Sequence, residues 1–244
     1  MVTTTQNYRQ DRPPLGRIED GFPWLELRRE TSWILLAAAI GFVVSAMCTQ
    51  VFALPRPLVV LVLALFVGPL ALGYARAHHL DIGAILGNRW LWAILRGIFM
   101  GAVLVILLLP DDPTPRVGEP QLALNVLWLG VVYGTAESLL VNAVPMMAAW
   151  SAFQVTGITR SVRGKIIAGV GTMLANLTVT VAYNLGFPEF RGPEIAGPAS
   201  SNFLIGVGFV LAPNPLISIV SHVVLHIAAV LAGGEGPVNL PPHY

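Results

Sequence analysis

Long uninterrupted apolar stretches recur along this chain, and they limit the folds that it can adopt. A transmembrane helix needs about 20 predominantly apolar residues, and a stretch of about 18 with few charges is already a candidate. Inside a bilayer every backbone N–H and C=O group must be paired within the protein, which leaves helices or closed barrels. Barrel strands give short alternating segments, whereas the stretches here are continuous. The sequence therefore predicts an all-α, polytopic transmembrane helical bundle of about seven spans. The predicted spans are residues 32–54, 58–75, 91–109, 122–153, 166–185, 202–212 and 216–232.

Composition excludes several classes of protein. Hydrophobic residues make up 55% of the chain and charged residues only 11%, with a mean hydropathy of +0.71, which is too apolar for a soluble domain of this length. The net charge of +1 offers no basic surface for phosphates, so nucleic acid is not expected as a partner. The expected partner is the lipid bilayer. Cys48 is the only cysteine and lies in an apolar stretch, which predicts a small buried side chain.

Charges at the ends of the spans predict the domain organisation and the orientation. Residues 1–30 form a polar, partly interfacial tail, and residues 31–244 form a single transmembrane domain. The tail carries five arginines, and the connections 76–89 and 160–165 are also basic. Basic loops are retained in the cytoplasm, so we expect the tail to be cytoplasmic and the acidic loop 111–119 to lie outside.

His78 and His79 occur together in one of these basic connections. Adjacent residues on a helix point about 100° apart, so the two imidazoles are poorly placed to bind one metal ion. We expect them to form a loop pair at the membrane surface.

The fourth predicted span is too long for a straight helix. Residues 122–153 would exceed a hydrocarbon thickness of about 30 Å by more than half. Gly130, Gly134 and Pro145 are the candidate positions for a bend.

Two GxxxG pairs predict close helix packing. Gly97 and Gly101 form one pair, and Gly130 and Gly134 form the other, directly before Glu137.

A few polar side chains fall inside the predicted membrane region. A carboxylate there is costly, so Glu137 is expected to face a protein interior or a water-filled cavity and to have a partner. His222 and His226 are four residues apart, which places them on one face of the last span. Asn184 lies nearer the outer end of the fifth span. Two further asparagines are lesser members of this group, Asn142 and Asn176.

These side chains allow several kinds of chemistry. A carboxylate beside an imidazole can hold and polarise a water, and a second imidazole with an amide can stabilise an oxyanion. Glu137, His222 and His226 could instead bind a divalent metal ion with an open coordination position. The Glu and the His can also pair only to satisfy each other's hydrogen-bonding groups, with no further function. A proton relay in a carrier is a further alternative, although the paired broken segments of many carriers are not evident.

The order of these residues resembles the CPBP family of intramembrane endopeptidases, which includes the type II CAAX prenyl proteases. The resemblance covers residues 122–231: Glu137 in a helix preceded by glycine, LGFPE directly after Asn184, and a final helix NPLISIVSHVVLHIAAVL. The family's first motif is a pair of glutamates followed by arginine. Here Ala136 replaces one glutamate and Asn142 stands in place of the arginine.

The second family motif is Phe, three residues, His, and the third is His, three residues, Asn or Asp. Thr180 and Asn184 occupy the second, and His222 and His226 occupy the third. The resemblance implies that Glu137 is the base, that Asn184 stands where a water-binding histidine belongs, and that His222 is the oxyanion histidine with His226 replacing its amide partner.

The resemblance thus implies a divergent intramembrane endopeptidase that hydrolyses a peptide bond in or near the membrane through a water activated by glutamate and histidine. The resemblance implies a membrane-associated or prenylated peptide as substrate. The alternative is a catalytically inactive relative that binds or regulates a membrane partner.

Overall fold

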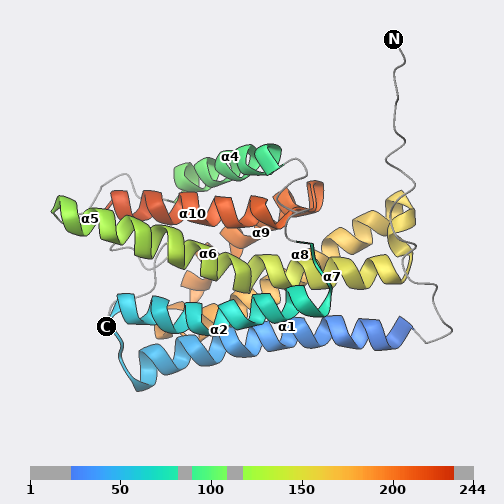
Figure 1. The fold of residues 1–244 in the computed structure, drawn as a ribbon, viewed down its shortest axis with the longest axis horizontal. Helices are drawn as coiled ribbons and strands as arrows, with labels where there is room; N and C mark the ends of the chain where they lie inside the picture. Colours follow the sequence, from blue (N-terminus) through green and yellow to red (C-terminus); the bar gives the residue numbers. More distant parts are fainter. Residues whose placement is uncertain (1–22, 82–89, 109–117, 234–244) are drawn as a thin grey trace, which may run out of the picture.

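The computed structural model describes residues 23–81, 90–108 and 118–233, and every regular element in these parts is helical (Figure 1). The predicted all-α helical bundle is therefore confirmed. The amino-terminal residues 1–22, the connection 82–89 and most of the acidic loop, 109–117, lie outside the described residues. The longer helices are α1 Pro23–Ala46, α2 Arg56–Ala77, α4 Trp90–Leu108, α7 Val144–Val155, α8 Val162–Leu185, α9 Ala196–Leu211 and α10 Pro215–Leu231.

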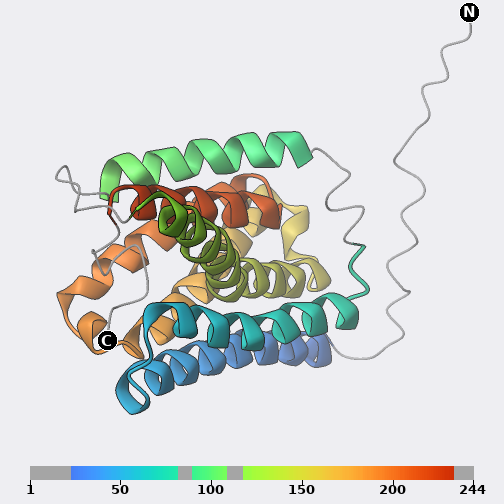
Figure 2. The same cartoon turned by 60° about the vertical axis from the view of Figure 1, so that its left-hand side comes forward.

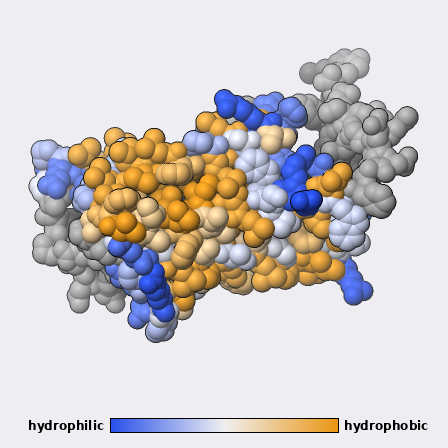
Figure 3. Space-filling model, turned by 90° about the horizontal axis from the view of Figure 1, so that it is seen from below, coloured by the Kyte–Doolittle hydropathy of each residue, from blue (hydrophilic) through white to orange (hydrophobic). Residues whose placement is uncertain are grey.

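Six of the helical segments described are long and apolar enough to cross a membrane. α10, with 17 residues, is shorter but also apolar. Large apolar side chains cover the outside of the bundle, for example Phe99 at 69%, Ile106 at 80% and Leu211 at 80% exposure. Figure 3 shows a broad apolar face of this kind. The chain is a multi-pass membrane protein, as its hydropathy predicted.

The two largest differences from the predicted boundaries are at the starts of α1 and α9. α1 begins at Pro23, so residues 23–30 extend the first helix instead of belonging to the tail. α9 begins at Ala196, before the predicted start of its span at residue 202, because Pro198 sits in the first turn, where no intrahelical N–H bond is lost. Short 3-10 turns at Pro188–Phe190 and Pro193–Ile195 join α8 to α9.

The structure corrects the prediction that His78 and His79 form a pair at the surface. His79 is exposed, but the side chain of His78 is only 8% exposed, and its Nε2 lies 3.4 Å from Oε1 of Glu30 on α1. Its ring also packs on Tyr74, with the ring centroids 4.3 Å apart. The prediction failed because Glu30, assigned to the tail, lies on α1 and is fully buried.

The long fourth span is one helical segment from Glu119 to Val155 with two π-helical interruptions. The expected departure from a straight α-helix is confirmed, because one interruption contains Gly130 and the other ends just before Pro145. Between them lies α6, Tyr133–Ser138, which carries Glu137. π-turns insert an extra residue into a helix and reorient the side chains that follow. The segment runs as α5 Glu119–Asn125, η2 Val126–Val132, α6, η3 Leu139–Ala143 and α7.

Both GxxxG pairs pack against α10, which lies between α4 and the η2–α6 segment (Figures 1 and 2). A Cβ atom on Gly97 would lie 2.6 Å from Cβ of Val220, and one on Gly130 would lie 2.7 Å from Cγ1 of Ile227. Only glycine allows approaches this close. The predicted close packing is confirmed, and it fixes the helix that carries both histidines.

The remaining core lies between α10 and the α1–α2 pair. Buried side chains from α1, α2, α6, η3 and α8 pack together there, among them Leu63, Leu140 and Tyr183. Cys48 is 2% exposed within this cluster, in agreement with its predicted role as a small buried side chain.

Candidate functional site

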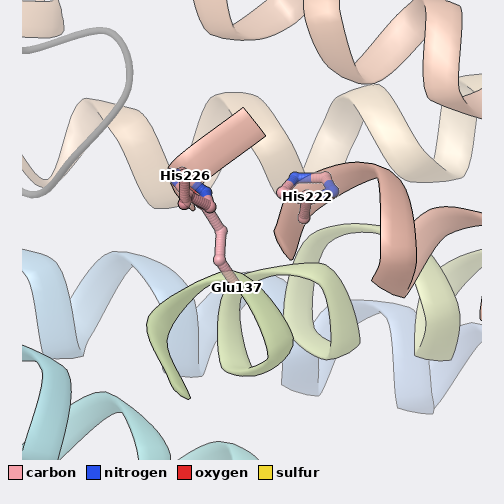
Figure 4. Close-up of side chains that lie close together, drawn as sticks. All are labelled: Glu137, His222 and His226. Atoms are coloured by element: carbon pink, nitrogen blue, oxygen red, sulfur yellow. The ribbon is translucent and has the colours of Figure 1, made fainter. Parts of the chain in front are cut away.

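Glu137 and His226 meet across the interface between α6 and α10. Oε2 of Glu137 lies 2.6 Å from Nε2 of His226, and both side chains point toward each other in Figure 4. Glu137 is 9% exposed and His226 3%. The predicted partner of the buried carboxylate is therefore an imidazole, and the short contact is a charge-assisted hydrogen bond.

Tyrosines surround this pair on the side of α6 and α8. The ring centroid of Tyr133 lies 4.8 Å from that of His226. The hydroxyl groups of Tyr133 and Tyr183 lie 3.1 Å apart, and both residues are buried. The Tyr133 ring restricts the positions open to the His226 side chain, and the Tyr183 hydroxyl contacts that of Tyr133 from α8.

His222 lies one turn before His226 on α10, with the ring centroids 5.8 Å apart. Its Nδ1 is 3.2 Å from the carbonyl oxygen of Ser218, and because a carbonyl can only accept, Nδ1 must donate. Its Nε2 is 3.5 Å from Nδ2 of Asn142, an amide nitrogen that can only donate. The contact with Ser218 places a proton on Nδ1, and the longer contact with Asn142 fits a neutral imidazole with a lone pair on Nε2.

A network of asparagine amides fixes which end of the Asn142 amide faces His222. Nδ2 of Asn142 donates to Oδ1 of Asn202 at 2.6 Å, and Nδ2 of Asn176 donates to Oδ1 of Asn142 at 2.9 Å. Nδ2 of Asn176 also donates to the backbone oxygen of Asn202 at 3.0 Å. The asparagines come from η3, α8 and α9 and are all buried. Each amide orientation is set by its neighbours, so the network holds Asn142 with its NH2 group toward His222.

Asn184 lies at the same site, and its side-chain amide makes one hydrogen bond within its own helix. Its Nδ2 donates to the carbonyl oxygen of Thr180 at 2.8 Å, one turn earlier on α8. An amide NH2 group has a second hydrogen, so Asn184 keeps donor capacity.

A small cavity connects these groups. It has about 20 Å³ of room for the centres of water molecules, enough for about one water. The structure thus brings Glu137, Asn184, His222 and His226 to one cavity. The lining residues are Tyr133, Glu137, Asn184, Phe187, Phe190, Pro198, Ser201, Asn202, His222, Leu225 and His226.

Glu137, His222 and His226 also form a set of potential metal ligands. One donor atom from each lies within 4.8 Å of the others, and all three residues are buried. Two imidazoles and a carboxylate are a ligand set found at catalytic zinc sites.

Sequence reasoning missed Tyr133, Tyr183, Ser201 and Asn202. Asn202 was the one with a signal, because an asparagine inside an apolar stretch needs a partner in the same way as Asn176. Ser201 and Tyr183 are ordinary near the ends of apolar stretches, and Tyr133 inside one carries no charge to mark it; the places of all three depend on helix rotation.

Comparison with protein-family models, with curated proteins and with solved structures gave no match.

Proposed function

We propose that this protein is a divergent intramembrane endopeptidase that uses a water held at Glu137. The observation that carries the proposal is the Glu137–His226 pair, 2.6 Å apart, at the wall of a cavity with room for about one water. A carboxylate in this position can act as a general base. The ordering of the motif residues, which resembles the CPBP family, supports the same reaction.

In this reaction Glu137 takes a proton from the water while the water oxygen bonds to the peptide carbonyl carbon. The proton then passes to the leaving amine nitrogen as the C–N bond breaks. His226 donates a hydrogen bond to the carboxylate and orients it.

The oxyanion needs a donor that faces the cavity. In its neutral form, which fits both contacts, His222 donates its one N–H group to Ser218. We therefore place the second hydrogen of the Asn184 amide at the oxyanion, and His222 serves there only after it takes up a proton at Nε2.

The substrate class that fits is a peptide held at the membrane, by a transmembrane segment or a prenyl group. The cavity lies inside a bundle with a largely apolar exterior, so a substrate anchored in the bilayer reaches it without leaving the lipid.

The experiment that tests this proposal is cleavage of membrane-tethered and prenylated peptide libraries by purified protein in detergent or liposomes. Glu137→Gln should lower the rate by at least about 100-fold, since general-base catalysis contributes about that much or more. Glu119→Gln is the matched control, because Glu119 is exposed in the first turn of α5. Cleavage that survives in Glu137→Gln contradicts the assignment of the base.

The second candidate function is a non-catalytic membrane protein that binds or regulates a partner. The amide network favours it, because Asn142, Asn176 and Asn202 already pair with one another and leave a connected buried structure that needs no reaction. In that case Glu137→Gln leaves partner binding, measured by co-purification, unchanged.

We also propose that the amino terminus lies in the cytoplasm, on the basis of the basic residues in the tail and in the connection 160–165. A cysteine-free background, Cys48→Ala, allows a direct test with a membrane-impermeant maleimide on intact cells. Thr114→Cys in the acidic loop should react from outside, and Thr159→Cys, directly before the basic connection 160–165, should react only after lysis. The reverse pattern contradicts the orientation.

A further inference from the structure

The three donors at the site come from two helices in an arrangement suited to a metal ion. His222 and His226 lie one turn apart on α10, and Glu137 reaches them from α6 (Figure 4). One donor atom from each lies within 4.8 Å of the others. We propose that these three side chains bind a divalent cation of the zinc class; this rests on the proposed function, since it names a cofactor for the same site.

His222 is prepared as a ligand. Metal-bound histidines almost always donate their other ring N–H group to a carbonyl, a carboxylate or water, which fixes the ring. Here Nδ1 donates to the Ser218 carbonyl at 3.2 Å, and the Nε2 lone pair meets only a long 3.5 Å contact with Asn142. Such a contact is weak, so little hydrogen-bond energy opposes a bond from Nε2 to a cation.

Glu137 and His226 need a small rearrangement. Zinc–ligand bonds of about 2.0–2.1 Å place two ligands of a tetrahedral site roughly 3.4 Å apart. The contact of 2.6 Å between Oε2 and Nε2 would therefore open, and the cation would replace the proton between these atoms. Binding releases that proton, so the affinity falls as the pH is lowered.

The ligand types select the cation. Two imidazole nitrogens and one carboxylate suit Zn²⁺ and Co²⁺, whereas Mg²⁺ and Ca²⁺ prefer oxygen ligands alone. The three protein ligands leave a fourth position, and the cavity beside them has room for about one water. Water on such a cation loses a proton near neutral pH. Without the cation Glu137 acts as the base described above; with the cation bound, Glu137 would serve as a ligand and the cation would take over the activation of the water.

The test uses the full chain in detergent, stripped with EDTA and dialysed. Co²⁺ is added while its visible absorption is followed, and bound Zn²⁺ is counted by elemental analysis after equilibrium dialysis. We expect one ion per chain, with affinity at least about 100-fold lower in His222→Ala and in Glu137→Gln, since even outer-sphere changes lower affinity by about 10- to 100-fold. His79→Ala is the matched control, because His79 is exposed and lies just after the C-terminal end of α2.

Proton release gives a second measurement that does not depend on the variants. Calorimetric titration of wild-type protein with Zn²⁺, in buffers that differ in ionisation heat, should show release of about one proton per ion. Absence of saturable binding overturns the metal site, and so does stoichiometric binding that persists in the double variant His222→Ala/His226→Ala.

The two proposals fail in different ways. Peptide cleavage that is unaffected by EDTA, in protein that binds no ion, leaves the proposed peptidase standing and removes the metal site. Stoichiometric binding without cleavage of any peptide does the opposite.

Discussion

The carboxylate of Glu137 and the imidazole of His226 form a 2.6 Å contact between residues that are 89 positions apart in the chain. A double-mutant cycle with Glu137→Gln and His226→Gln should show that they are coupled. Buried partners in direct contact interact by about 0.5–3 kcal/mol, and independent sites add within about 0.3–0.5 kcal/mol. Denaturant unfolding of the four proteins in detergent measures the free energies. Additive effects would contradict the coupling.

Gly134→Ala should disturb the site without removing any functional group. The new Cβ would lie 3.0 Å from Cδ2 of His226 and 3.1 Å from Cα of Val223. Overpacking of this kind costs about 1–3 kcal/mol, and here it moves His226 relative to Glu137. We expect lower thermal stability together with lower cleavage activity. Gly68→Ala on α2 is the control, because nothing lies within 4 Å of its Cβ position, and it should be neutral or slightly stabilising.

Asn176→Ala should break the amide network at its centre. It removes the donors to Asn142 and to the Asn202 backbone and leaves both acceptors buried. An unsatisfied buried group costs about 1–3 kcal/mol. Unfolding in detergent should show a loss of at least that size, and the NMR signal of His222 should change because, within the amide network, Asn142 is then held only by its bond to Asn202. Asn125→Ala, on the half-buried α5–η2 junction, should show neither effect.

His78 should make the stability depend on pH. Burial, assisted by the charge of Arg29, lowers the pKa of His78 below its ordinary value of 6.5. The unfolded chain then binds the proton more readily than the folded protein, so the stability contributed by neutral His78 is present above pH 6.5 and falls as the pH drops below that value.

The measurement is thermal unfolding in detergent at about pH 7.5 and pH 5.5, above and below the unfolded pKa. His78→Phe keeps an aromatic ring on Tyr74 and should show a smaller decrease at low pH than the wild type. His79→Phe should behave as the wild type, since His79 is exposed. An equal decrease in all three proteins would refute the role of His78.

Hydropathy was enough to place the helices, because the bilayer requires each span to be apolar and to pair its backbone N–H and C=O groups within the span. It was less informative where a helix continues past the apolar stretch. Pro23–Glu30 is charged yet helical, and Ala196–Ser201 resembles a loop by its Gly and Pro content. In both places side chains pack into the fold: Glu30 lies against His78, and Pro198 and Ser201 line the cavity.

The apolar environment of the bilayer also made part of the site predictable. An acid in an apolar stretch must have a partner, and the only imidazoles inside a predicted span were His222 and His226. The pairing of Glu137 with His226 rather than His222 depends on the rotation of α10 between its two glycine-faced neighbours. Glu30 was missed because its partner His78 follows another helix, a contact that no local sequence pattern reports. Asn202 carried a signal as an amide in an apolar stretch, but the sequence did not identify Asn142 as its partner.

The glycine contacts on two sides of α10 also limit how the site can admit a substrate. Gly97 and Gly101 hold one side of the helix, and Gly130 and Gly134 hold the other, so α10 has little freedom to slide or turn. The rest of the cavity wall includes Phe187, Phe190 and Pro198, from the α8–α9 connection and the first turn of α9. The entrance for a substrate is therefore expected on the α8–α9 side, with α10 acting as the fixed wall.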